Sequence, residues 1–567
     1  MNASPTGSKR QGQQDDKQET DVVGTLMSLT IAFTLAMAFR GFVLEGFVIP
    51  TGSMGPTLMG EHARFFSPVT AFEYPADSQT ARGMAMTNDQ RALPVFDPMI
   101  STRNPIETRP PAAIAAEARA GDRVLVLKPL FAFSAPKRWD VVVFKNPTDP
   151  AGDTQNYIKR MVGLPNESFL LFDGDVFTGP IDAKSQDLKV ARKPEHVQRA
   201  LWQPVYDSDY QPILPVKELE TGMRATWPGA PWKAASGATG WTLAPSREWR
   251  FAGSGSTALE WNSEAAIIDD WNSYNALRMF YDAARRSPRG MADLAWRTDT
   301  CFPVSDLRLC ATVECAALPE FETTFELTAR SSVFEFAIRG KGEVEVTRRG
   351  MESGESLGGA KAAFSPRTDG VLSFECWHVD QQLWVFVDGT EVLRMPYEFG
   401  SMDERLQASM FGRNAEGYVR RHTDTHMPTP PKLAWRFTSA QPFSLRRVQV
   451  DRDLYYRPVL HDANNQFAIN GDYLSGPGFG TNYEQPARLG ATDYVMLGDN
   501  SAASRDARLW GRAHPLTLRT FGDAQPGVVP ADMIVGKAWA VYFPAPISMK
   551  PGGSSFIPDF GRLRFIR

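Results

Sequence analysis

The first pattern along the chain is an unbroken apolar run close to the N-terminus. Residues 22–39 read VVGTLMSLTIAFTLAMAF and contain no charged side chain. As a helix with a rise of 1.5 Å per residue they would span about 27 Å, close to the thickness of the hydrocarbon layer of a bilayer. Residues 1–21 are polar and mixed in charge, which predicts a disordered tail. We therefore predict a transmembrane helix at residues 22–40.

The basic residues around this run predict its orientation. Lys9, Arg10 and Lys17 precede it, whereas Arg40 alone follows within twenty residues. The positive-inside rule then places the tail in the cytoplasm and the rest of the chain outside. A cleavable signal peptide is the alternative, because residues 36–38 offer a small-x-small cleavage site. The length of the run favours a retained, single-pass anchor.

Short runs rich in β-branched residues follow, each bounded by turn signals. They read VLVL at 124–127, VVVFK at 141–145, YIKRMVG at 157–163 and YVML at 494–497. Such runs predict strands.

From Phe321 apolar and polar positions alternate, as in half-buried strands. The runs include FETTFELTA, SVFEFAIRG, VLSFECWHV and LWVFVDGTEVLRM, with Asp388-Gly389 as a hairpin signal. We predict a β-sandwich at 301–456, which resembles concanavalin/laminin-G-like sandwiches. Residues 185–300, rich in Trp, Pro and Gly, stay unassigned, and residues of about 60–120 read as a smaller insertion with a helix at 112–120.

Composition excludes one class of partner. The chain has 567 residues, 43% hydrophobic, enough for three or four domain-sized units. With 61 basic and 65 acidic residues the net charge is −4, so no basic field for nucleic acid is expected.

Cysteine and histidine spacing predicts neither a metal nor a cofactor. The four cysteines lie in the insertion, have no C-x-x-C spacing, and allow three disulfide pairings outside the cytoplasm; they are Cys301, Cys310, Cys315 and Cys376. His422 and His426 flank Asp424 in a Thr- and Pro-rich stretch. A solvated cluster is the favoured reading there, and we assign no metal.

Three further stretches carry candidate chemistry. In FVIPTGSMGPTL, residues 47–58, prolines on both sides and Gly52 predict a turn that presents the Ser53 hydroxyl. The plainer reading is a turn serine bonded to its own backbone.

Lys159 lies inside the apolar run YIKRMVGLP. An ordinary lysine is only about 0.1% neutral at pH 7.5, so a lysine acting as a base needs its pKa lowered by roughly 3 units. Apolar neighbours such as Phe144, Ile158 and Met161 would provide the burial. The alternative is a solvated lysine on an edge strand.

The third stretch, YVMLGDNSAASRDARLWG, places Ser504, Asp506 and Arg508 at alternating positions on one face of an extended segment. A solvated face with a weak Asp–Arg pair is the alternative.

Together these stretches resemble the bacterial type I signal peptidases, membrane-anchored Ser/Lys endopeptidases. TGSMGPTL matches the nucleophile box, GDRVLVLK the next strand, DVVVFKNP with YIKRMVGLP the general-base box, and GDNSAASRDAR the last box. The likeness covers the chain to about residue 180 and again from about 472. It implies a mainly β fold whose catalytic core is divided between 41–184 and 457–567.

The resemblance also implies roles. Ser53 would be the nucleophile and Lys159 its general base, without a histidine. The Thr51 hydroxyl and the Ser53 backbone N–H would form the oxyanion hole. Ser504 would orient Lys159, while Asp506 and Arg508 would pair. Shallow pockets for small residues at positions −1 and −3 of the substrate would be lined by Phe47, Ile49, Val143, Tyr157 and Ile158.

The implied partners are preprotein signal peptides and membrane lipid, and the implied place is the cytoplasmic membrane with the catalytic domain outside. The sandwich would bind a glycan or a peptide, or be purely structural. Two other functions are weighed: a catalytically silent binding protein that displays the sandwich, and a self-cleaving or regulatory Ser/Lys protease.

The chain departs from the family at four places. Trp139 stands where a glycine usually precedes the aspartate of the general-base box, and Asn166-Glu167 replaces Gly-Asp after GLP. Ser501 and Ala507 replace Arg and Ser in the last box. None removes a proposed catalytic group, but each bears on local turn geometry.

Overall fold

The structure is a computed structural model. It describes residues 22–567 except 101–105, 150–154, 213–228, 245, 264, 280–300, 411–428, 462–475, 522–524 and 549–555. The predicted tail and the cluster of His422, Asp424 and His426 lie outside the described residues.

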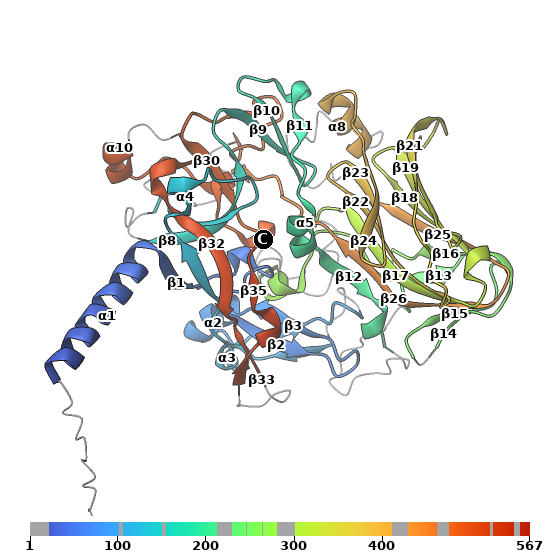
Figure 1. Cartoon of the computed structure of the whole chain (residues 1–567), viewed down its shortest axis with the longest axis horizontal. Coiled ribbons are helices and arrows are strands. Elements are labelled where there is room, and N and C mark those ends of the chain that lie inside the picture. Colours follow the sequence, from blue (N-terminus) through green and yellow to red (C-terminus); the bar gives the residue numbers. More distant parts are fainter. Residues whose placement is uncertain are drawn as a thin grey trace, which may run out of the picture.

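Helix α1 (Val22–Phe42) forms from the apolar run and projects from the side of the molecule opposite the sandwich (Figure 1). None of its residues is buried against the rest of the chain. Its 21 residues are long and apolar enough to cross a membrane, with a length of about 31 Å. Only Val43 separates it from strand β1 (Leu44–Val48), so the candidate anchor leads directly into the next sheet.

The first sheet, called the core sheet below, combines strands from both ends of the chain. Its order is β1-β6-β32-β7-β8-β30-β31, with β35 paired to β32. All its pairs are antiparallel, and β1 is an edge strand. The other bounds are β6 Arg123–Leu127, β7 Val141–Lys145, β8 Asn156–Gly163, β30 Asp493–Leu497, β31 Val529–Pro530, β32 Ile534–Phe543 and β35 Arg564–Phe565. A smaller sheet joins β11 (Lys189–Val190), β10 (Asp175–Pro180), β9 (Glu167–Phe172) and β29 (Ala487–Arg488).

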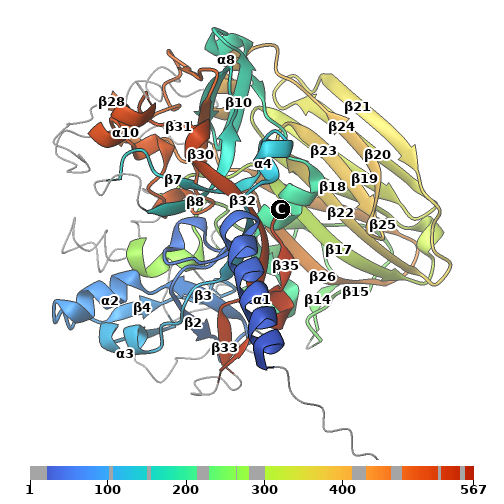
Figure 2. The ribbon, with the colours of Figure 1, turned by 60° about the vertical axis from the view of Figure 1, so that its left-hand side comes forward.

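Two large sheets form the sandwich seen beside the core (Figures 1 and 2). One has the order β14-β15-β26-β17-β22-β23-β24, with β12 on β26; the other has the order β13-β16-β25-β18-β19-β20-β21. The bounds of the first are β12 Gln203–Asp207, β14 Trp241–Leu243, β15 Trp249–Phe251, β17 Leu307–Cys315, β22 Val371–Val379, β23 Gln382–Val387, β24 Thr390–Pro396 and β26 Phe443–Arg452. Those of the second are β13 Trp232–Ala234, β16 Gly255–Trp261, β18 Glu322–Ala329, β19 Ser332–Arg339, β20 Glu343–Gly350, β21 Ser356–Ala363 and β25 Lys432–Ser439.

One hydrophobic core lies between these sheets. It takes alternate residues of facing strands, such as Leu309 and Val313 of β17 and Phe334 and Phe336 of β19. The mainly β prediction and the inserted sandwich are therefore confirmed. Strands at 203–261, where the sequence left the chain unassigned, complete both sheets because their aromatic residues, including Trp232, are buried in this core. Of the cysteines, Cys310, Cys315 and Cys376 are free thiols in β17 and β22.

A small module lies beside the core sheet, in the stretch read as an insertion of about 60–120. Its apolar core is separate from that of the core sheet and includes Phe65, Tyr74 and Ile114. The elements are β2 (His62–Phe66) paired with β3 (Glu73–Asp77), β4 (Leu93–Val95) paired with β5 (Glu107–Arg109), and helices α2 (Gln79–Met86) and α3 (Pro111–Ala116).

At two positions where the resemblance leads us to expect glycine, this chain has a larger residue in the left-handed region of the backbone. Trp139 has φ +79° and Asn166 has φ +61°. Glycine adopts this region without strain, asparagine tolerates it, and a bulky residue rarely does. Trp139 is held there by packing, since its side chain is buried in the cluster that includes Phe144 and Met161.

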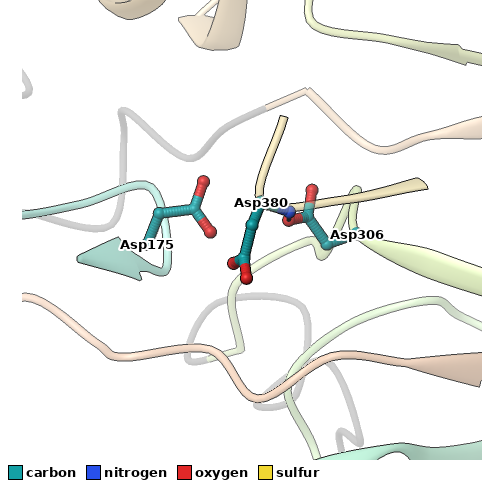
Figure 3. Close-up of side chains that lie close together, drawn as sticks. All are labelled: Asp175, Asp306 and Asp380. Carbon is teal, nitrogen blue, oxygen red and sulfur yellow. Dashed lines mark hydrogen bonds between the residues drawn. The ribbon is translucent and has the colours of Figure 1, made fainter. Parts of the chain in front are cut away.

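Buried ion pairs join the core to the sandwich. Asp175 begins β10, Asp306 precedes β17 and Asp380 follows β22. Figure 3 shows their three carboxylates approaching from separate chain segments, and one oxygen of each lies within 4.8 Å of the others.

Three buried cations surround these carboxylates. Arg330 pairs with Asp306, Arg405 with Asp175 at 2.7 Å, and Lys193 with Asp380 at 2.5 Å. Burial would raise the pKa of Asp306, but Arg330 and His378 hold it below its usual range. Because the cations fill the space around the carboxylates, we interpret the cluster as an ion-paired junction between the two parts and assign no metal to it.

The junction generates a stability prediction. Arg330 pairs with Asp306 and, at 3.0 Å, with Asp173. Arg330→Met leaves both carboxylates buried without this positive charge beside them. The free energy of unfolding should fall by about 3–5 kcal/mol, measured by denaturant titration. Arg339→Met, which removes more exposed pairs with Glu322 and Glu345, is the matched control and should cost less than about 1 kcal/mol. Equal losses in the two variants would contradict the junction.

Candidate active site

The turn that carries Ser53 follows directly from edge strand β1. The Ile49 N–H still donates to the Asp122 carbonyl at 2.9 Å, and a short 3-10 turn then spans Gly52–Met54. A Cβ added at Gly52 would lie 2.5 Å from Cε1 of Tyr274, so a larger residue there would have to displace this buried ring. Gly52 and Met54 are buried, while Ser53 is half-buried and Thr51 is exposed. The turn is thus packed from behind and presents Ser53.

Lys159 reaches this turn from β8. In the antiparallel register Lys159 lies opposite Val142 of β7, and the next residue, Arg160, opposite Leu497 of β30. Nζ of Lys159 is 2.6 Å from Oγ of Ser53 and donates to the Ile158 carbonyl at 3.0 Å. The structure therefore brings together two residues that are 106 positions apart in the sequence.

Burial changes the acidity of this amine. Lys159 is 3% exposed. Burial lowers the pKa of Lys159 to about 8, although the carboxylates of Asp506 and Asp499 act to raise it. About a tenth of the side chains would then be neutral at pH 7, against far less than 1% for an ordinary lysine.

Both carboxylates near Lys159 are bound to arginines. Asp499 accepts two hydrogen bonds from Arg160, each at 2.7 Å. Asp506 accepts from Arg508 at 2.9 and 2.7 Å and from the Gly498 N–H at 3.0 Å. All four charged side chains are at most 1% exposed. Such two-point pairs fix the last box beside Lys159 and reduce the net field at its amine.

Ser504 lies in the site but does not make the bond expected of it. Its Oγ is buried and has no hydrogen-bond partner in the part of the chain that the structure describes, Lys159 included. A Cβ added at Gly498 would lie 2.2 Å from this Oγ and 2.4 Å from the Ser53 carbonyl oxygen. Ser504 therefore borders the turn that carries Ser53, and its orienting role stays a prediction.

Asn500 is a site residue to which the sequence assigned no role. Its N–H donates to the Ser53 carbonyl at 3.0 Å, and its Nδ2 donates to the Gly52 carbonyl at 2.8 Å. The neighbouring Asp499 N–H donates to Sδ of Met54 at 3.5 Å. The GDN turn in the last box was the sequence signal that could have pointed to Asn500. The sequence does not show that its N–H and its carboxamide bind the carbonyls of Ser53 and Gly52.

Four of the five predicted pocket residues share one apolar cluster beside the turn. Ile49 and Val143 are fully buried in it, whereas Phe47 and Ile158 are half-buried at its border. Tyr157 lies in the neighbouring cluster; its ring centroid is 6.0 Å from Nζ of Lys159 and its hydroxyl donates to Asp149 at 2.8 Å.

The site generates a titration prediction. NMR of lysines labelled at Cε and Nζ should show Lys159 titrating near pH 8, with the signal assigned by its loss in Lys159→Met. In Asp506→Asn the midpoint should move to lower pH, because a carboxylate that favours the charged amine is gone. Exposed Lys137 in the same spectrum is the reference. A midpoint for Lys159 near 10.5 would contradict the burial argument.

The family comparison covers the part of this site that carries Lys159, and Ser53 lies outside the matched residues. Residues 106–195, which include Lys159, match the model of the family "Signal peptidase, peptidase S26". Over 150 residues the chain is 26% identical to "Signal peptidase I" of Rickettsia typhi (strain ATCC VR-144 / Wilmington), which is 26% of this chain and 40% of that protein. The chain thus matches about two fifths of the length of the curated relative.

Several solved structures are similar to a part of the chain. Carbohydrate-binding module CBM66 of Bacillus subtilis aligns over 39% of this chain and 95% of its own, with 6% identity and a TM-score of 0.22. Galectin LEC-6 of Caenorhabditis elegans aligns over 26% and 82%, with 10% identity and a TM-score of 0.16. These scores carry no argument about ligands. The two sequence comparisons confirm the resemblance drawn from the motifs: part of this chain is similar to the signal peptidases of peptidase family S26.

Proposed function

We propose that this protein is a membrane-anchored Ser/Lys endopeptidase that removes N-terminal signal peptides from exported preproteins after small residues at positions −1 and −3. The observation that carries the proposal is the 2.6 Å contact between Lys159 Nζ and Ser53 Oγ inside a buried site. A lysine that is partly neutral near pH 8 and touches a hydroxyl is the arrangement that a Ser/Lys hydrolase needs.

The chemistry follows from this contact. The neutral amine of Lys159 accepts the Ser53 hydroxyl proton as Oγ attacks the scissile carbonyl. The resulting ammonium then returns a proton to the leaving amine, and an acyl-enzyme remains on Ser53. A water molecule that gives its proton to Lys159 releases the acyl group and restores the hydroxyl. The Ser53 N–H and the Thr51 hydroxyl are the proposed donors to the oxyanion.

Substrate would enter along the edge of the core sheet. Strand β1 pairs with β6 on one side, and a single residue separates its start from the end of α1. An extended peptide held by backbone hydrogen bonds beside this strand would lead toward the Ser53 turn, with small side chains against Phe47 and Ile158. Because Ser53 lies eleven residues beyond Phe42, the last residue of α1, its reach to the membrane surface is short.

The proposed location follows from the same helix. With α1 in the cytoplasmic membrane and residues 1–21 in the cytoplasm, the core sheet and the sandwich lie on the outer side. Signal peptides reside in the same bilayer, so tethering Ser53 there raises its effective concentration toward them. The glycan or peptide ligand considered for the sandwich stays a prediction.

A catalytically silent binding protein is the main alternative. Such a protein would not need a buried lysine beside a serine, since burying an amine costs free energy. Self-cleavage as the main activity would be recognised by loss of the 567-residue chain during incubation.

Two substitutions test the proposed dyad. Ser53→Ala and Lys159→Met should each lower kcat for cleavage of a preprotein by at least about a thousandfold, because the nucleophile or its proton acceptor is gone. Lys137→Met, at an exposed lysine three residues before the general-base box, should leave kcat unchanged. Near-normal cleavage by either dyad variant would rule out the Ser/Lys mechanism.

The pH dependence follows from the protonation state of Lys159. The pKa of Lys159 is lowered to about 8, and only the neutral amine accepts the proton. The neutral fraction grows as pH rises, so kcat should increase about tenfold per pH unit below 8 and level off above it. A rate profile measured from pH 6 to 10 checks this, and a profile that falls over that range would contradict the assigned base.

A further inference from the structure

A segment of the large insertion reaches the nucleophile turn. After β16 the chain forms a short 3-10 turn at Ser273–Asn275, where Asn272 accepts from the Asn275 N–H at 3.0 Å. Tyr274 and Asn275 are each 1% exposed. Cβ atoms added at Gly52 and Gly55 would lie 2.5 and 2.7 Å from Cε1 of Tyr274, so its ring packs against the backbone on both sides of Ser53.

The carboxamide of Asn275 pairs with that of Asn500. Nδ2 of Asn500 donates to Oδ1 of Asn275 at 2.8 Å, and Nδ2 of Asn275 donates back to Oδ1 of Asn500. The other proton on Nδ2 of Asn500 goes to the Gly52 carbonyl. Asn275 therefore meets the remaining donor and acceptor of this buried amide and fixes which end of it faces Gly52.

The Gly52 carbonyl and the Ser53 N–H belong to one peptide unit. Because that unit is planar, fixing the direction of its C=O fixes the direction of its N–H. The Asn500 side chain donates to the Gly52 carbonyl, and the Asn500 backbone N–H donates to the Ser53 carbonyl. The Gly52 carbonyl also accepts from the Gly55 N–H at 2.9 Å. The direction of the Ser53 N–H is thus set by these two donors, and Asn275 holds one of them, the amide of Asn500, in place.

The segment with Asn275 is itself anchored to the sandwich. Nη2 of Arg452, at the end of β26, donates to the carbonyls of Asp270 and Trp271, each at 3.0 Å. Arg457 pairs with the Asp270 carboxylate, and its own N–H donates to Oγ of Ser501 in the last box at 2.8 Å. The sandwich and the site are therefore joined through buried hydrogen bonds.

We propose that Asn275 is a positioning residue, which aligns the Ser53 N–H for the oxyanion through Asn500 and the Gly52 carbonyl. The insertion would then supply part of the catalytic geometry as well as a domain outside the core. This inference rests on the proposed function, because it assigns a role in the same hydrolytic site.

The test uses the full chain in detergent and a fluorogenic peptide with alanine at −1 and −3. Asn275→Ala should lower kcat by about tenfold to a hundredfold with KM changed by less than about threefold. Misaligning an oxyanion donor should cost less than removing the donor altogether. The midpoint of the pH–rate profile should stay where the unmodified chain has it, because Asn275 acts on the oxyanion donor and not on Lys159. Ser273→Ala, in the same turn, is the matched control and should keep full kcat.

A double-mutant cycle separates this role from general loss of packing. If Asn275 acts through Asn500, the variant with both residues changed to alanine should be no slower than Asn500→Ala alone. Should Asn275→Ala fail to fold, Asn275→Asp is read in the same way, because it keeps the shape but places an oxygen against Oδ1 of Asn500.

The positioning role would be overturned by full kcat in a folded Asn275 variant. It would also be overturned if the loss of kcat in the double variant equalled the product of the losses in the two single variants. Failure of the unmodified chain to cleave the peptide would instead count against the proposed function itself. The two failures are therefore distinguishable.

Discussion

The structure depends on one buried contact, between the amine of Lys159 and the hydroxyl of Ser53. Burial favours the neutral amine, and nearby carboxylates oppose it. Burial prevails because Asp499 and Asp506 are each bound at two points by an arginine, so their charge at Nζ is largely compensated. The two Asp–Arg pairs thus stabilise the last box and permit a lysine of lowered pKa beside it.

The position of the site is set by the start of the chain. A single residue lies between the end of α1 and edge strand β1, and the turn that carries Ser53 follows that strand. Backbone length alone therefore holds Ser53 near the plane where α1 would leave a membrane. Edge strand β1 leads from α1 to the turn, and Phe47 of that strand packs at the border of the apolar cluster beside it.

The insertion is part of this arrangement. Its sheets have their own apolar core, yet ion pairs around Asp175, Asp306 and Asp380 fix them to the β9–β10 region of the core. A second connection runs through residues 270–275 and Asn500 to the backbone of the turn at Gly52–Met54. Two separate buried contacts between the same bodies restrict their relative motion more than either would alone, which suits a site whose geometry they share.

The sequence by itself determined the local features. A charge-free run of 18 residues predicts a membrane-spanning helix, and period-2 alternation from Phe321 predicts strands with one buried face. The boxes around Ser53, Lys159 and Asp506 were recognisable because their chemistry is carried by adjacent residues.

Tertiary structure alone decided the long-range features, because they arise from contacts between segments far apart in the chain. The Ser53–Lys159 distance depends on how β1, β7 and β8 are ordered in the sheet, which no spacing of 106 residues fixes. The strands at 203–261 are short and irregular in pattern, and become strands through pairing with β25 and β26. Asn275 and Asn500 are ordinary amides in sequence, and they acquire a partner and a direction only when two loops, 225 residues apart, are packed against one turn.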